Sequence, residues 1–359
     1  MGAGPQPLGR EHARVPARPL DAAATTAARA RQAQLLKPPG SLGRLEALAV
    51  WLAGCTGEER PSVRARVVVA AADHGVAAEG VSAYPSDVTA QMVGAFVTRR
   101  AAVTALAAEA GADLRIVDAG VRAGGGGGGV PRDGVIVLGL EPSRDIATAP
   151  ALEVGEVATA VDAGRDLAAE AARDGITVLV GGEMGIGNST PATCLAAWLT
   201  GRPGGELAGP GTGLDGAGLA RKRAVVERAL ALHGPEIRGP LGALRRLGGG
   251  EIAVLCGVAL GAGEQGLAYV CDGLIATAAA AIAVGIEPAL APRLLAGHRS
   301  PEPGHGALLD HLGLEPVLDL GMRLGEGSGA VTALAVLRLA CAAHGGMATF
   351  AEAGVSGPA

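Results

Sequence analysis

Short apolar runs alternate with longer alanine-rich stretches over most of the chain. Six of these runs have the length of buried strands, and they cover residues 66–72, 114–117, 135–138, 177–180, 267–271 and 294–296. Continuous apolar runs separated by helical stretches are typical of parallel strands that are buried on both faces. Because crossovers between parallel strands are right-handed, helices should cover both faces of the sheet. The pattern therefore predicts an α/β domain with a mostly parallel sheet.

The segments outside these runs predict helices, an arm and a loop. Residues 21–33 and 41–52 are expected to be helices, separated by the breaker Lys37-Pro38-Pro39-Gly40. Residues 1–20 are rich in Pro, Arg and Gly without periodicity and predict a loose arm. The glycine run at 124–129 predicts a surface loop.

Polar residues and glycines follow most of the predicted strands. They occupy residues 73–75, 118–120, 181–188, 272–273 and 297–300. Open parallel sheets bind their ligands outside the carboxyl ends of the strands. We therefore expect these residues to gather on one rim and to form the functional site there.

The glycine-rich segment 181–193 predicts a turn that brings the backbone close to a ligand. It runs into Ser189-Thr190-Pro191, a helix start whose free N–H groups would suit a phosphate. The glycine spacing alone favours an ordinary tight strand–helix turn. The spacing matches neither of the glycine motifs for nucleoside triphosphates and dinucleotides. Because a carboxylate repels phosphate, Glu183 is expected to face a sugar or a cationic ring.

Two residue types are nearly absent from the 359 residues. The chain has two lysines, Lys37 and Lys222, and one asparagine, Asn188. Lysine is a compact, strongly hydrated point charge, which distinguishes it from arginine, and it commonly contacts phosphates. Lys222 follows the glycine-rich segment 211–215 and is expected to open a helix over residues 219–230. The alternative is a solvated lysine.

A glutamate and three histidines complete the candidate chemistry. Glu326 lies in Gly-Glu-Gly ahead of a predicted helix at 330–342, where a ligand could approach it closely. Compensation of the helix dipole would also explain this glutamate. His74, His298 and His305 lack the spacing of metal ligands, so we interpret them as hydrogen-bonding groups at the rim and expect no metal.

Composition narrows the functional classes. Hydrophobic residues make up 49% of the chain and charged residues 18%, which indicates a globular protein. Aromatic residues at 2% and a net charge of −5 argue against a nucleic-acid partner. The five cysteines form no C-x-x-C pair and predict buried, reduced thiols in a cytoplasmic protein. The apolar stretch 274–284 is shorter than the roughly 20 residues that a bilayer requires.

Together, seven segments closely resemble the nicotinate-nucleotide–dimethylbenzimidazole phosphoribosyltransferase family. The resemblance extends from about residue 37 to 354. Its motifs are Lys37–Glu46, Asp73–Pro85, Val88–Val93, Gly182–Thr190, Gly211–Asp215, His298–His305 and Arg323–Ala330.

The resemblance implies a reaction and an architecture. The family moves phosphoribosyl from nicotinate mononucleotide to 5,6-dimethylbenzimidazole for the lower ligand of cobalamin, without a cofactor. It is a homodimer with a Rossmann-like large domain and a small helical domain built from both chain ends. Here, residues 61–300 would form the large domain, and residues 21–60 and about 301–359 would contribute to the small one.

The resemblance also implies roles for individual residues. Glu326 would be the catalytic base, and Glu183 would be a second catalytic carboxylate. With the glycine turns included, the expected substrate-binding residues are Lys222, Ser300, Gly182, Gly185, Gly187, Asn188, Gly211, Thr212, Gly213, Ser82, Tyr84 and Gln91.

Two other classes of function stay open at this stage. A metal-dependent phosphohydrolase could use Asp73, His74, Asp272 and His298 on the same rim. A sensor or carrier could bind a nucleotide without turning it over. Purines, phenols or benzimidazoles could each serve as the accepting base.

Overall fold

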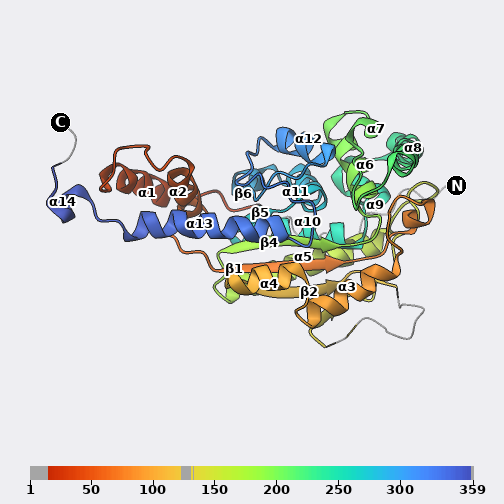
Figure 1. The fold of residues 1–359 in the computed structure, drawn as a ribbon, viewed down its shortest axis with the longest axis horizontal. Coiled ribbons are helices and arrows are strands. Elements are labelled where there is room, and N and C mark those ends of the chain that lie inside the picture. Colours follow the sequence, from red (N-terminus) through yellow and green to blue (C-terminus); the bar gives the residue numbers. More distant parts are fainter. Residues whose placement is uncertain (1–14, 123–130, 132, 357–359) are drawn as a thin grey trace.

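The computed structural model describes residues 15–122, 131 and 133–356 and contains one six-stranded parallel sheet (Figure 1). Its strands are β1 (Ala65–Ala71), β2 (Asp113–Asp118), β3 (Val135–Val137), β4 (Val178–Met184), β5 (Ala268–Cys271) and β6 (Leu294–Ala296). Their order, β3-β2-β1-β4-β5-β6, is that of the Rossmann fold, in which ligands bind at the carboxyl ends near the reversal of strand order. The predicted parallel α/β architecture is confirmed.

Helices cover both faces of the sheet, as the sequence predicts. One face carries α2 (Arg44–Thr56), α3 (Asp87–Val97), α4 (Ala102–Glu109) and α13 (Ser328–Gly346). The helices on the other side are α5 (Val154–Arg173), α6 (Ser189–Thr200), α7 (Gly204–Leu207), α8 (Gly216–His233), α9 (Gly239–Leu247), α10 (Gly250–Gln265), α11 (Leu274–Ile286) and α12 (Pro303–Leu312). Three short 3-10 helices span Gly75–Glu79, Gly234–Glu236 and Pro288–Arg293.

The sheet separates two hydrophobic clusters, and alternate residues of β1 belong to each of them. Val67 and Val69 point to the α13 side, whereas Val68 and Ala70 point to the α10 side. Small residues let the helices approach closely: a Cβ on Gly164 of α5 would lie 2.2 Å from the carbonyl oxygen of Val254 in α10. Close contact between helices therefore fills a core that contains few aromatic residues.

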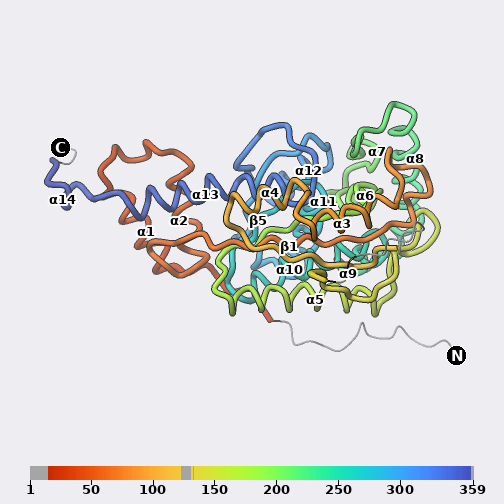
Figure 2. The backbone as a smooth tube through the Cα atoms, turned by 60° about the horizontal axis from the view of Figure 1, so that its bottom comes forward, coloured from red at the N-terminus to blue at the C-terminus, as the bar shows by residue number. Residues whose placement is uncertain are grey.

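Helices α1 (Ala22–Gln34) and α14 (Phe350–Ala353) lie toward one end of the molecule, away from α6–α8 (Figures 1 and 2). Helices α1 and α2 pack together, and Arg31 of α1 donates to the carbonyl oxygens of His344 and Met347. Lys37 is buried and pairs with Glu46 at 2.8 Å, so this lysine joins the turn before α2 to the helix itself.

Several predicted boundaries were wrong. Strand β4 continues to Met184, so Gly181, Gly182 and Glu183 lie in the strand and not in the turn after it. Helix α8 begins at Gly216, three residues early, because Asp215 caps it by accepting the N–H of Gly218 at 2.7 Å. Helix α2 begins at Arg44, after a turn at 41–43.

The arm prediction was wrong for the residues that the structure describes. Arg18 N donates to Gly263 O at 2.9 Å, and the Arg293 guanidinium donates to the carbonyl oxygens of Arg18 and Pro19. Residues 15–20 are therefore anchored to α10 and to the 3-10 helix at Pro288–Arg293. Residues 1–14 and the glycine run at 124–129 lie outside the described residues.

Two further expectations concern thiols and membranes. All five cysteines are free and buried, as predicted. In the described ranges, α13 is the one helix whose length and hydropathy would suit a membrane span. Helix α13 packs against α2, α4 and β4, and a core helix passes the same test of length and composition.

Candidate active site

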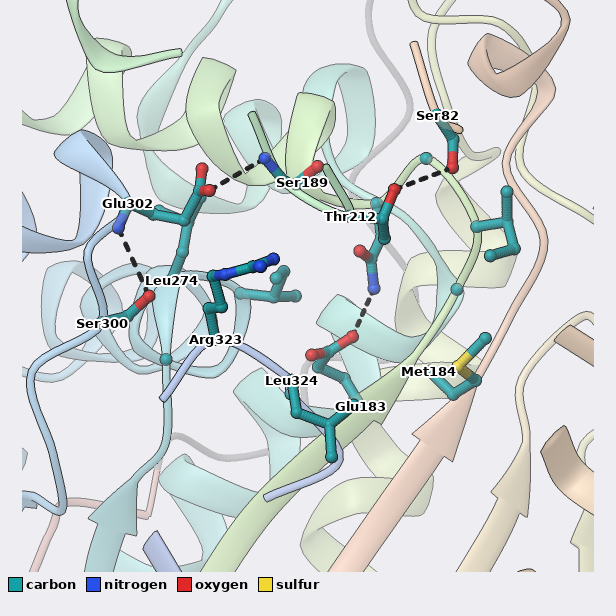
Figure 3. Close-up of a pocket in the computed structure, with 18 of the residues that line it drawn as sticks. Ser82, Glu183, Met184, Ser189, Thr212, Leu274, Ser300, Glu302, Arg323 and Leu324 are labelled. Carbon is teal, nitrogen blue, oxygen red and sulfur yellow. Dashed lines mark hydrogen bonds between the residues drawn. The ribbon is translucent and has the colours of Figure 1, made fainter. Parts of the chain in front are cut away.

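A cavity opens at the carboxyl ends of β4, β5 and β6 (Figure 3). Eight of the predicted site residues line it, namely Ser82, Glu183, Gly185, Gly187, Asn188, Gly211, Thr212 and Ser300. They come from segments that are far apart in the sequence. Of the five segments predicted to form the rim, 181–188, 272–273 and 297–300 contribute to the cavity lining, whereas 73–75 and 118–120 do not.

Glu183 supplies a buried carboxylate to the cavity. It is 7% exposed, and Asn188 Nδ2 donates to its Oε2 at 2.5 Å. Burial raises the pKa of Glu183 to about 8, and the neighbouring carboxylates of Glu251, Asp272 and Glu326 act in the same direction, against the Asn188 hydrogen bond. Glu183 can therefore change its charge near neutral pH.

Lys222 lies beneath the cavity wall. Its side chain is fully buried in α8, and Nζ donates to Ser189 Oγ at 3.0 Å and to Gly209 O at 2.9 Å. Burial lowers the pKa of this amine, while Glu302 opposes the change. The solvated alternative was therefore wrong. The lysine sets a positive charge at the start of α6, where the helix dipole also favours an anion.

The segment after β6 forms the opposite wall. Ser300 N donates to His305 Nδ1 at 3.0 Å, and Ser300 Oγ accepts the N–H of Glu302 at 3.4 Å. Glu302 Oε1 accepts the N–H of Gly211 at 2.9 Å, which ties this wall to the glycine-rich segment 211–213. Figure 3 shows Arg323 extended between these two walls.

Glu326 lies next to Glu183 but outside the residues that line the cavity. It is 4% exposed and has φ of 63°, a left-handed conformation that non-glycine residues seldom adopt. Its Oε2 accepts the N–H of Val103 at 3.2 Å at the start of α4, and its backbone N–H donates to Glu183 O at 3.2 Å. Burial raises the pKa of Glu326, and Asp272 adds to this, against the hydrogen bond from Val103.

Other predicted site residues also lie outside the cavity lining. Gly182 packs against the Glu326 backbone: an added Cβ would lie 2.3 Å from Glu326 O. Tyr84 is 54% exposed and Gln91 is also exposed on α3. Gly213 adopts φ of 107° in the turn before α8. None of these four residues lines the cavity.

The three rim histidines make hydrogen bonds or ion pairs. His74 Nε2 is 2.7 Å from Glu251 Oε1, and His298 Nε2 is 3.5 Å from Asp272 Oδ1. Burial lowers the pKa of His305 to about 3, and its Nε2 is 3.2 Å from Thr277 Oγ1. In the part of the chain that the structure describes, no group of three His, Cys, Asp or Glu residues could hold a metal ion.

No individual role was predicted for Ser189, Glu302 and Arg323, which line the cavity, or for Glu251, which pairs with His74 outside the lining. Ser189, Glu302 and Arg323 lie inside the segments that carry the family resemblance, so position could have identified them. Glu251 lies in the first turn of the apolar helix α10, and its partner His74 is 177 residues away. No local signal marks it.

The chain is similar to proteins of one family over almost its whole length. A family model described as phosphoribosyltransferase matches residues 17–355. A nicotinate-nucleotide–dimethylbenzimidazole phosphoribosyltransferase of Ectopseudomonas mendocina is 51% identical, over 95% of this chain and 97% of the relative. One of the same name from Roseiflexus is 48% identical, over 94% of this chain and 96% of the relative. The crystal structure of CobT from Thermus thermophilus matches with a TM-score of 0.88 at 44% identity, covering 94% of this chain and 100% of that one.

Proposed function

The chain belongs to the nicotinate-nucleotide–dimethylbenzimidazole phosphoribosyltransferase family, and on that basis we propose that it transfers phosphoribosyl from nicotinate mononucleotide to 5,6-dimethylbenzimidazole. The products are α-ribazole 5'-phosphate and nicotinate. The observation that carries the proposal is one cavity that combines the N-terminal end of α6, backed by Lys222, with the buried carboxylate of Glu183.

The phosphate of the mononucleotide would bind at the start of α6. Gly185 and Gly187 let the backbone approach the ligand, and Lys222 adds its charge through Ser189. Ser300 and Thr212 provide hydroxyl groups on either side. The phosphate lies far from the breaking bond, so its binding energy serves to orient the ribose.

Glu183 would stabilise the positive charge that develops on the ribose. The pyridinium of nicotinate mononucleotide is already a good leaving group, so its departure leaves cationic character at the anomeric carbon. A cation in the cavity favours the ionised form of Glu183 and lowers its pKa from about 8. The carboxylate would therefore gain its charge as the nucleotide binds.

Glu326 would act as the general base. One ring nitrogen of the benzimidazole forms the new bond to the anomeric carbon, while the electron pair of the old bond leaves with nicotinate. The other ring nitrogen must lose its proton, which Glu326 accepts. Its raised pKa brings this carboxylate toward the pH of the reaction. Attack opposite the departing nicotinate inverts the anomeric carbon from β to α.

A single incubation tests the proposal. The protein is mixed with nicotinate mononucleotide and dimethylbenzimidazole, and free nicotinate and the new ribotide are measured by chromatography. We expect both products in equal amounts, in the presence of a chelator as well. Nicotinate release that needs a metal, or tight binding without turnover, would contradict the proposal and support the phosphohydrolase or the carrier.

Three further points extend the proposal. The protein would be a cytoplasmic homodimer. Residues 21–60 and about 301–359 would contribute to a small helical domain, and residues 61–300 would form the large one. Helix α2 packs against both α1 and α13, which supports this division for these three helices. Helix α12 packs on α6 and α11, so its contacts are with the large domain although the proposed bounds place it in the small one.

A further inference from the structure

His74 and Glu251 form a buried pair behind the turn that carries Asn188. Neither side chain is exposed, and His74 Nε2 lies 2.7 Å from Glu251 Oε1. His74 Nδ1 is 3.2 Å from the hydroxyl of Ser143. Glu251 lies in the first turn of α10, where the helix dipole favours a carboxylate. A buried polar pair of this kind is weak evidence for a stabilising role, so its position needs another explanation.

Two glycines enclose the ring of His74. A Cβ on Gly249 would lie 2.3 Å from His74 Cε1, and a Cβ on Gly185 would lie 3.2 Å from His74 Cδ2. The ring therefore fills the space between the start of α10 and the Gly185 turn. Gly185 O accepts the N–H of Asn188 at 3.1 Å, so a shift of this turn would move Asn188 as well.

We propose that His74 and Glu251 are positioning residues for phosphoribosyl transfer, which fix the Gly185–Asn188 turn and, through Asn188, the Glu183 carboxylate. Glu251 also adds negative charge below the cavity, and its second oxygen, Oε2, is buried without a hydrogen-bond partner among the described residues. The inference rests on the proposed function. It adds two residues that touch neither substrate.

The charge of Glu251 bears directly on Glu183. The titratable and charged groups around Glu183 are Glu251 of α10, Asp272 after β5, Glu326 before α13, His74 after β1, His298 after β6 and Arg323 in the cavity. Glu251 is one of the carboxylates that raise the pKa of Glu183. Removing that charge should let Glu183 ionise at lower pH.

Two variants separate geometry from charge. His74→Gln removes the ring between the two glycines, and it should raise the Kd for nicotinate mononucleotide about tenfold because the phosphate turn is displaced. Glu251→Gln keeps the shape and an acceptor oxygen, and it should move the acid limb of kcat/KM to lower pH. Calorimetry measures the Kd without turnover, so binding is tested even if the proposed reaction fails.

A matched control is His233→Gln. His233 is also buried and hydrogen-bonded, to Ile146 O at 2.9 Å, but does not line the cavity. This variant should keep the wild-type Kd and pH profile. The inference is wrong if folded His74→Gln and Glu251→Gln proteins keep both as well, or if His233→Gln changes them equally.

A milder variant serves if the other two fail to fold. Ser143→Ala removes only the hydroxyl beside His74 Nδ1. It should raise the Kd for nicotinate mononucleotide severalfold, and an unchanged Kd would overturn the inference.

Discussion

Asn188 Nδ2 donates a hydrogen bond of 2.5 Å to Glu183 Oε2, so the single asparagine of the chain holds the carboxylate in its cavity. The bond opposes the effect of burial on the pKa of Glu183. Asn188→Ala removes it and should lower kcat/KM for nicotinate mononucleotide about tenfold. Steady-state nicotinate release measures this, and unchanged kinetics would show that the bond is not needed.

The raised pKa of Glu183 predicts how stability depends on pH. An unfolded glutamate titrates near 4.5, whereas Glu183 in the folded protein titrates near 8. Between these values the folded state binds more protons than the unfolded state, so this residue makes stability fall as pH rises from about 5 to 8. Glu183→Gln should flatten this decline. Thermal unfolding across the pH range tests it, and parallel curves for the two proteins would contradict the assignment.

The burial of Lys222 predicts that arginine cannot replace it. The amine donates to Ser189 Oγ and Gly209 O inside a fully buried site, where the larger guanidinium does not fit. Lys222→Arg should raise the KM for nicotinate mononucleotide at least about tenfold. The exposed neighbour Arg223 gives the control, since Arg223→Lys should change nothing. Equal kinetics for both variants would show that the reaction does not require a lysine at position 222.

The close packing of Gly182 against the Glu326 backbone predicts that position 182 requires glycine. A Cβ there would lie 2.3 Å from the Glu326 carbonyl oxygen, so Gly182→Ala must displace the Glu326 backbone. A displacement of about 1 Å can cost about 100-fold in rate. Gly155→Ala in α5 is the control, because a Cβ there meets nothing within 4 Å. Gly182→Ala with wild-type kcat would contradict the role of Glu326.

The sheet could be predicted from the sequence because its apolar runs are continuous, and each of the six became a strand. It placed Glu183 in a turn because Gly181 and Gly182 are poor strand formers, yet pairing with Val68 and Val69 of β1 carries β4 through both. Tertiary contact outweighed local propensity there.

The residues of the site also differ in whether the sequence could predict them. Glu183, Asn188 and Ser300 lie in motifs whose residues suggest polar chemistry, and they were predicted. The His74–Glu251 pair was not, because it joins two residues 177 positions apart and depends on how α10 packs behind β1. The local sequence pattern around either residue does not indicate such a contact.

The most direct test of the account is nicotinate release by a variant of Glu326. Wild-type protein, Glu326→Gln and Glu326→Ala are each incubated with nicotinate mononucleotide and dimethylbenzimidazole, after circular dichroism has shown that they are folded. With its base removed, each variant should release nicotinate at least about 100-fold more slowly than the wild type. Release at the wild-type rate by a folded Glu326→Ala protein would contradict the central claim.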